Sequence, residues 1–209
     1  MNKQHVGLVM MHIGISTVAA GLGLGGYNLW DSYRAGVQAY TALDAIVRYQ
    51  EEEAATDPNE TQETLHELLS DSEWELPTME VDGHRYIGTI SIPMIDVTLP
   101  VQEEWNLVLL KTSPCRYMGS PYQGDLIICA HNYAAHFGRL KNLLPGDEVF
   151  FTDVEENEFH YTVADIKTLD GTAVEEMKSG AWDLTLFTCT LGGQTRIAVR
   201  CDLLENDEL

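Results

Sequence analysis

The sequence predicts a mainly β fold, namely a β-barrel with short helices, preceded by an N-terminal transmembrane helix and a helical, acidic linker. Three observations lead to this prediction. Residues 6–30 contain no Asp, Glu, Lys or Arg, the second half of the chain contains many short runs that alternate apolar and polar residues, and turn residues separate those runs. Many short strands with little helix are typical of a closed or nearly closed barrel. We therefore expect an anchor over residues 1–30, a linker over residues 31–82 and a barrel domain over residues 83–209.

Composition narrows the possible functions. The 209 residues include 12 Lys+Arg and 33 Asp+Glu, which gives a net charge of −21. Broad contact with nucleic-acid phosphates requires basic patches, so no nucleic-acid partner is expected. The hydrophobic content of 44% is sufficient for a packed core. The four cysteines lack CxxC spacing and are too few for a disulfide scaffold, so we interpret them as separate thiols.

The uncharged run at the amino end is long enough to cross a membrane. A helix of 25 residues, at ~1.5 Å per residue, exceeds a hydrocarbon layer of ~30 Å. Tyr27 and Trp30 stand where an interfacial aromatic belt would lie. A cleaved signal peptide is the alternative, because Lys3 precedes the run and small residues such as Ala19 and Ala20 occur in it. The length of the run, and its continuation into a charged helical pattern, favour a retained anchor and hence the membrane as a partner.

Residues 31–55 have the periodicity of a helix. Apolar side chains recur at spacings of three and four and form one expected stripe: Tyr33, Val37, Tyr40, Leu43, Ile46 and Val47. Residues 56–82 are acidic and contain Pro58 and Pro77, which indicates a linker. One more short helix is expected within it, around Leu65, Leu68 and Leu69.

The remaining elements are short. Two strands flank Pro93 within residues 86–101, and further strands are predicted over residues 126–130, 148–152, 158–166, 184–189 and 196–204. Helical stretches are expected over residues 105–110, 136–143 and 172–177. Cys115, beside Pro114, is placed in a loop.

One predicted hairpin brings a thiol and a guanidinium together. If Gly192 and Gly193 are the central residues of its turn, Cys189 lies directly opposite Arg196. A guanidinium there would hold a thiolate, or donate hydrogen bonds to an oxyanion that forms beside the sulfur. The alternative is a buried Cys with a solvent-facing Arg. Arg200 shares the face of Arg196 but is farther from the turn, and we expect it to matter less.

A second candidate lies at the end of the apolar strand over residues 126–130. This strand delivers His131 to a loop, where functional residues concentrate. Imidazole is the usual partner of an activated cysteine, and the neighbouring Asn132 is a candidate to orient it. One alternative is a structural histidine. Another is zinc binding with Cys129 and His136, although zinc sites usually draw on tighter repeated pairs.

Taken in order, these strings resemble the sortases. They are IGTISIP from residue 87, LPV from residue 99, CAHNY from residue 129, HFGRL from residue 136, LLPGDEV from residue 143, LTLFTC from residue 184 and RIAV from residue 196. The resemblance covers about residues 86–204, and the TLxTC-type strand is its most specific part. It implies an eight-stranded barrel, an amino-terminal membrane anchor and a catalytic domain outside a Gram-positive-type cell.

The resemblance also implies roles. Cys189 matches the nucleophile, His131 its acid/base partner and Arg196 the arginine of the substrate carbonyl and oxyanion, while Asn132 and Thr188 match substrate-binding or orienting positions. The implied reaction cleaves an LPxTG-like sorting signal of surface proteins through a thioester and transfers the acyl group to an amine. No cofactor or metal is expected. Some sortases bind calcium, and candidate ligands for such a site are Glu103, Glu104, Glu155 and Glu156, for which surface solvation is the plainer interpretation.

Several functional alternatives stay open. The amine acceptor is a peptidoglycan precursor or a pilin. Asp57-Pro58-Asn59 resembles the lid of pilus-building sortases only faintly, which favours anchoring to the cell wall over pilin polymerisation. Leu191 departs from the Pro-Tyr or acidic pair that many sortases carry after the cysteine, and the loop to Arg196 is short. A membrane-tethered cysteine peptidase and a non-catalytic binding module are the remaining interpretations.

Overall fold

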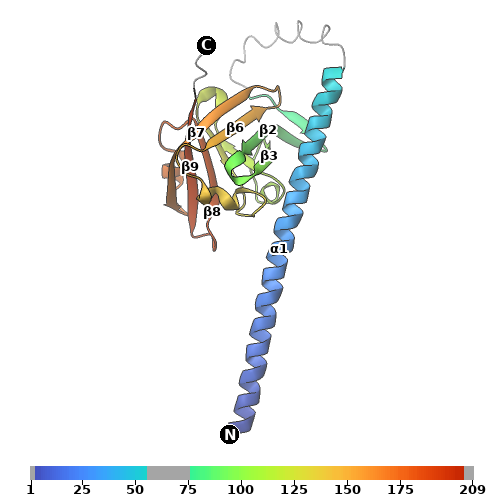
Figure 1. Cartoon of the computed structure of the whole chain (residues 1–209), viewed down its shortest axis with the longest axis vertical. Helices are drawn as coiled ribbons and strands as arrows, with labels where there is room; N and C mark the ends of the chain where they lie inside the picture. The colour runs from blue at the N-terminus through green and yellow to red at the C-terminus, as the bar shows by residue number, and fades with distance from the viewer. Residues whose placement is uncertain (1–2, 56–75, 205–209) are drawn as a thin grey trace. The chain divides into compact units, whose positions relative to one another are not determined.

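The computed structural model describes residues 3–55 and 76–204 (Figure 1). It divides into two compact units, residues 1–34 and residues 35–209. The predicted short helix of the linker, around residues 65–69, and the Asp57-Pro58-Asn59 segment lie outside the described residues.

The first unit is the start of one long helix, α1 (Lys3–Ala55). Its apolar stretch has a mean hydropathy of 1.7 over a membrane-length window, so by length and composition α1 could cross a membrane. The helix continues without interruption into the second unit, through residues 31–55, where the sequence predicts a helix. No proline occurs before Pro58, so nothing in the sequence forces a break.

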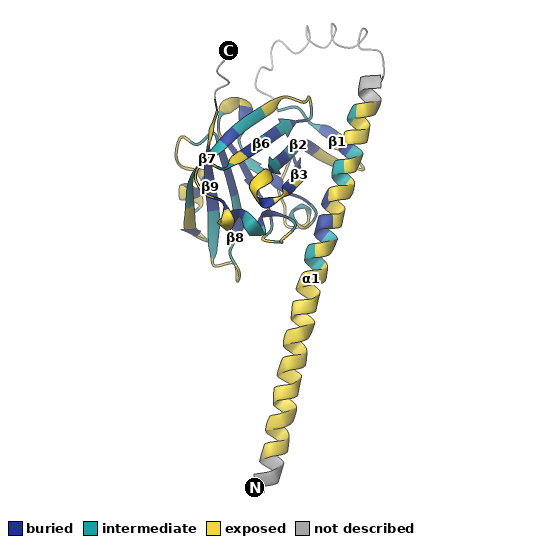
Figure 2. Cartoon of the chain, in the orientation of Figure 1, coloured by how far each residue is buried: buried dark blue, intermediate teal, exposed yellow. Residues whose placement is uncertain are grey.

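The second unit begins with the last part of α1, which packs against the barrel through small residues. Ala35, Gly36 and Ala39 are buried, together with Ile46 (Figure 2). The predicted apolar stripe is therefore mostly wrong, because four of its side chains are exposed: Tyr33, Val37, Tyr40 and Val47. Hydrophobic periodicity selects large side chains, whereas a close approach of backbones requires small ones.

Eight strands form a closed ring, as the sequence predicted. In ring order they are β2 (His84–Ile92), β3 (Val97–Gln102), β4 (Cys115–Met118), β5 (Leu126–Cys129), β8 (Leu184–Cys189), β9 (Thr195–Leu203), β7 (Glu158–Asp170) and β6 (Glu148–Asp153), and β6 closes the ring on β2. A short strand, β1 (Met79–Val81), adds to the edge of β2. The pairs β3–β4 and β5–β8 are parallel, and the other neighbours are antiparallel.

Alternation along these strands fills the interior with apolar side chains. On β8, for example, Leu184 and Leu186 point into the main core cluster, which also contains Phe137, Phe151 and Tyr161. Full burial of one such side chain contributes roughly 1.5–3 kcal/mol. The opposite face of β8, which carries Cys189, is consequently the outside of the barrel.

Some short elements differ from the prediction. The strands β1 and β4 were not expected, and Cys115 begins β4 rather than lying in a loop. Short 3₁₀ helices are η1 (Pro93–Ile95), η2 (Leu109–Lys111), η3 (Pro121–Gln123) and η4 (Phe137–Asn142), and the segment before β8 contains α3 (Val174–Lys178). A four-residue strand offers too little alternation to be distinguished from a loop.

Candidate active site

Cys189 and Arg196 are paired at the turn end of the β8–β9 hairpin. The two strands pair antiparallel over six residue pairs, the last of which is Cys189↔Arg196. Beyond it, the Thr190 N–H donates to the Thr195 carbonyl (N···O 3.0 Å). The predicted register is confirmed, so the thiol and the guanidinium leave neighbouring strands on the same face.

The turn of this hairpin differs from the prediction in one detail. The Gly193 N–H donates to the Thr190 carbonyl (2.9 Å), which makes Leu191 and Gly192 the central residues of the turn. Gly192 and Gly193 have φ values of 87° and 74°, a region that favours glycine. Leu191 is 96% exposed at the tip.

His131 follows β5, the strand that neighbours β8 on the side opposite β9. Strand β5 runs parallel to β8 with Cys129 opposite Phe187, and the Ala130 N–H donates to the Phe187 carbonyl (3.2 Å). Continued two residues past the end of β5, this register assigns His131 to the position beside Cys189. The neighbouring strands β5, β8 and β9 thus bring His131, Cys189 and Arg196 into one row on the outside of the barrel.

The two other predicted site residues do not share that row. Thr188 is buried and points to the opposite face of β8 from Cys189, where its Oγ1 donates to the Ala130 carbonyl (2.8 Å). This bond ties the end of β8 to the residue before His131. Asn132 is exposed in the loop after β5.

Arg196 is bound to its own hairpin in this structure. Its Nη1 donates to the carbonyls of Gly193 (2.8 Å) and Thr195 (3.1 Å). Hydrogen bonds from Thr172, together with the nearby Arg196 guanidinium, lower the pKa of Asp170 on β7. The guanidinium therefore lies between the turn carbonyls and a carboxylate, at the edge of the row.

Burial separates Cys189 from the other cysteines. All four are free thiols, but Cys115, Cys129 and Cys201 are buried, whereas Cys189 is partly exposed. Burial raises the pKa of Cys115 and of Cys201 to about 12, and it raises the pKa of Cys129 further. A thiolate is the reactive form of cysteine, and burial both hides the other three thiols and disfavours their thiolates, which leaves Cys189 as the one partly exposed thiol.

An aromatic surface lies beside the row. Phe187 is two residues before Cys189 on the same face and meets Tyr117 edge to face (ring centroids 5.4 Å apart). Trp105 packs on the other side of Tyr117 (5.6 Å), and the Lys178 ammonium lies 6.0 Å from the Tyr117 ring. Sequence reasoning missed this surface. The alternation of β8 already places Phe187 with Cys189, but nothing in the sequence indicates that Tyr117 joins it.

Comparison with known proteins identifies the family. Residues 90–204 match the family model of the Sortase domain, which is more than half of the chain. The chain belongs to the sortase family. A curated relative, sortase A of Listeria monocytogenes, is 26% identical over 200 residues, which are 90% of this chain and 85% of the relative. Sortases are transpeptidases of the cell surface that act on proteins with a C-terminal sorting motif, and membership implies that class of activity.

Solved sortase structures share the fold. Sortase C1 from Streptococcus agalactiae has a TM-score of 0.60 at 24% identity, over 78% of this chain and 100% of that chain. Clostridium perfringens sortase C, solved with the C-terminal cell wall sorting motif, has a TM-score of 0.60 at 22% identity, over 78% and 99%. These likenesses concern the barrel architecture.

Arg200 of this sortase has a structural position that the sequence did not reveal. It shares the Arg196 face as expected, but it is buried, with 3% exposure. Its Nη1 donates to the Met177 carbonyl (2.7 Å) and to Thr185 Oγ1 (2.8 Å), and its Nη2 donates to the Glu176 carbonyl (2.7 Å). Arg200 therefore clamps α3 onto the sheet beside the aromatic surface.

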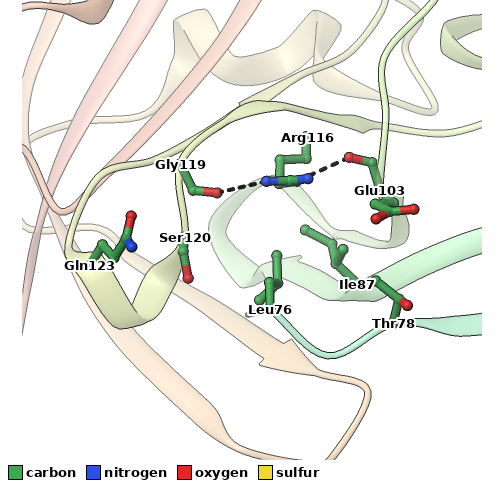
Figure 3. Close-up of a pocket in the computed structure, with 8 residues that line it drawn as sticks. All are labelled: Leu76, Thr78, Ile87, Glu103, Arg116, Gly119, Ser120 and Gln123. Carbon is green, nitrogen blue, oxygen red and sulfur yellow. Dashed lines mark hydrogen bonds between the residues drawn. The ribbon is translucent and has the colours of Figure 1, made fainter. Parts of the chain in front are cut away.

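A cavity of about 300 Å³ lies elsewhere on the barrel (Figure 3). Its lining comprises Leu76, Thr78, Ile87, Glu103, Arg116, Gly119, Ser120 and Gln123. Arg116 donates to the carbonyls of Glu103 (3.0 Å) and Gly119 (3.2 Å), so its guanidinium holds the wall of the cavity together. None of the three residues of the row lines it.

Within residues 3–55 and 76–204, no group of three or more His, Cys, Asp or Glu side chains is placed to hold a metal ion. Among the glutamates considered for calcium, Glu103 pairs with Arg85 instead (N···O 3.0 Å). Cys129, considered for zinc, is a buried thiol opposite Cys115.

Proposed function

We propose that this sortase is a cysteine transpeptidase that cleaves an LPxTG-like sorting signal and joins the new acyl end to an amine of the cell wall. The observation that carries the proposal is the row His131–Cys189–Arg196, in which the one partly exposed thiol stands between an imidazole and a guanidinium on adjacent strands. These are the three groups that acyl transfer through a thioester requires.

The proposed reaction has two steps. The Cys189 sulfur attacks the scissile carbonyl, and the C–N bond breaks as His131 protonates the departing amine, which leaves a thioester. An incoming amine, deprotonated by His131, then attacks the thioester carbonyl. The C–S bond breaks, a new amide forms and the Cys189 thiol is regenerated.

Arg196 would donate to the oxyanion that develops in each step. In the resting structure its Nη1 is bound to turn carbonyls, so a bound peptide has to compete for this donor. Loss of one such donor typically reduces the rate by ~10²–10³. Lysine lacks the planar fork of arginine, so Arg196→Lys should not restore it.

The aromatic surface of Phe187, Tyr117 and Trp105 supplies a wall for the apolar part of the sorting peptide, because it lies next to Cys189 on the same face. A similar fold in Clostridium perfringens sortase C was solved with a cell wall sorting motif, which supports a peptide as the substrate. The apolar part of α1 is proposed as a single-pass membrane anchor with the barrel outside the cell.

The decisive experiment uses mass spectrometry of full-length enzyme with LPxTG-like peptides and candidate amines. We expect a thioester on Cys189 and, with an amine present, an amide product. Cys189→Ala should abolish both, while Arg196→Lys and Arg196→Ala should collapse kcat with much smaller changes in KM. Acylation at another cysteine, or turnover in Cys189→Ala, would show that the assignment is wrong.

The same experiment separates the alternatives. A cysteine peptidase would release only the hydrolysed peptide whether or not amine is present. A pilin-polymerising sortase would prefer a lysine side chain within a folded pilin to a peptidoglycan-type amine. We favour cell-wall anchoring, in agreement with the curated relative named sortase A.

A further inference from the structure

The end of α1 contacts the loop that carries His131. Gly36 lies so close to this loop that a Cβ added to it would stand 2.9 Å from the Ala135 Cβ. Ala35 and Ala39, on the same side of the helix, have 0% exposure, and Ala39 belongs to the main core cluster of the barrel. Within residues 31–40 of α1, the buried positions are thus all Gly or Ala.

The loop itself transmits any displacement toward His131. Its residues are wound tightly, because the Phe137 N–H donates to the His131 carbonyl (3.2 Å) and the Gly138 N–H donates to the Tyr133 carbonyl (2.9 Å). A Cβ at Gly138 would lie 2.5 Å from the Asn132 carbonyl oxygen, so the two ends of the loop pack backbone against backbone. Movement at residues 135–136 therefore reaches His131.

His136 is a deeply buried loop residue near the contact with α1. Its side chain has 0% exposure, and neither ring nitrogen has a hydrogen-bond partner among the described residues. The ring stands near the Ala35 carbonyl. The Tyr133 ring lies between the two imidazoles, with its centroid 5.5 Å from that of His136 and 4.9 Å from that of His131. The buried His136 ring therefore meets the backbone of α1 at Ala35, which makes His136 part of the contact between the loop and the helix.

We propose that residues 35–46 of α1 position the catalytic base of this sortase: the contact between Gly36 and Ala135 fixes the 131–137 loop and so sets His131 against Cys189. Gly36 and His136 are positioning residues, since neither belongs to the row that meets the substrate. The inference rests on the proposed function, because it assigns His131 the acid/base role.

A pair of size-swap variants of the full chain in detergent tests this contact. Gly36→Ala adds the clashing methyl group, and Ala135→Gly removes the atom that it meets. We expect Gly36→Ala to lower kcat about tenfold with KM changed by less than about twofold, since a displacement of a few tenths of an ångström misaligns a proton transfer. Gly36→Ala combined with Ala135→Gly should recover the kcat of Ala135→Gly alone.

The matched control is Gly26→Ala, which makes the same change in the same helix at a place with no atom within 4 Å. It should keep the wild-type kcat. Alanine is a better helix former than glycine, so a loss of activity in Gly36→Ala is not explained by a weaker helix. An unchanged kcat in Gly36→Ala, or a loss that Ala135→Gly leaves uncorrected, would overturn the proposal.

A second readout needs no substrate. The imidazole resonances of His131 in histidine-labelled enzyme, assigned with His131→Gln, should shift in Gly36→Ala, return in the double variant and stay in place in Gly26→Ala. If wild-type enzyme transfers no sorting peptide, the proposed function fails, yet these resonances still decide the positioning role. Resonances that do not respond to Gly36→Ala would refute it.

Discussion

His136 should make the stability of the barrel depend on pH between about 6.5 and 4. Burial lowers its pKa from 6.5 to about 4, and the neighbouring His131 acts in the same direction, while the Ala35 carbonyl opposes them. Because the folded-state pKa is the lower one, the stabilisation is complete above pH 6.5. It is lost as the pH falls toward 4, since the unfolded chain takes up the proton first.

The magnitude follows from the two pKa values. Proton linkage with pKa values of 6.5 unfolded and about 4 folded gives a loss of about 2 kcal/mol by pH 5 and about 3 kcal/mol by pH 4. Native stabilities are typically 5–15 kcal/mol, so this loss is readily measured.

The assay compares wild type with His136→Leu in a chain beginning at Asp31, which lacks the whole uncharged run of residues 6–30. Urea unfolding, followed by tryptophan fluorescence, gives the free energy of unfolding at pH 7, 5 and 4. At pH 7 the two should differ by no more than about 1 kcal/mol, because the ring is neutral there and leucine removes only its interaction with the Ala35 carbonyl. Between pH 7 and 5, wild type should lose about 2 kcal/mol more than His136→Leu. Parallel pH profiles for the two proteins would refute the reasoning.

Three further predictions concern other parts of the chain. Iodoacetamide at pH 8 should label only Cys189 in the folded protein and all four cysteines in urea, as counted by mass spectrometry; labelling of a buried thiol in the fold would contradict this. Arg200→Ala should cost ~3 kcal/mol of stability, because it removes three hydrogen bonds from a buried guanidinium, whereas Arg196→Ala should leave the unfolding free energy nearly unchanged. A chain beginning at Thr78 should melt about 10 °C below one beginning at Asp31, because it lacks Ala39 and Ile46, and equal melting temperatures would show that the end of α1 adds nothing.

The strands of the barrel were predictable where alternation is long. On β8 and β9, alternate residues face the main core cluster, namely Leu184 and Leu186 on β8 and Ile197, Val199 and Cys201 on β9. The intervening glycines indicate the turn, so the pair Cys189↔Arg196 followed from local sequence. The strand β4 was missed because its four residues include Arg116 and are bounded by Pro114 and Gly119. Its place in the ring is fixed by pairing with β3 and β5, which local periodicity does not encode.

In the helix before the barrel, the element was predicted correctly and its buried face was not. Its pattern contains a plausible stripe of large apolar residues, and the fold buries a different one made of Ala35, Gly36, Ala39 and Ile46. Hydrophobic periodicity gives most weight to large apolar side chains, so it does not detect a helix face on which small residues allow the helix backbone to approach its neighbour closely. Only the position of Ala135 explains why glycine stands at residue 36.

The placement of His131 next to Cys189 depends both on strand pairing and on the packing of α1. The pairing of β5 with β8 is parallel and spans 58 residues, as the bond from Thr188 to the Ala130 carbonyl shows, so no local turn specifies it. Each strand carries one of the two groups at or just after its last residue. Strand pairing therefore fixes the backbone up to that point, and it does not fix the orientation of a side chain that follows it. The loop after β5 then has to hold the imidazole, and its outer side is packed against α1 at Gly36. Under the proposed function, strand pairing places the base and the helix contact adjusts it, which accounts for the packing of Ala39 in α1 against the barrel core.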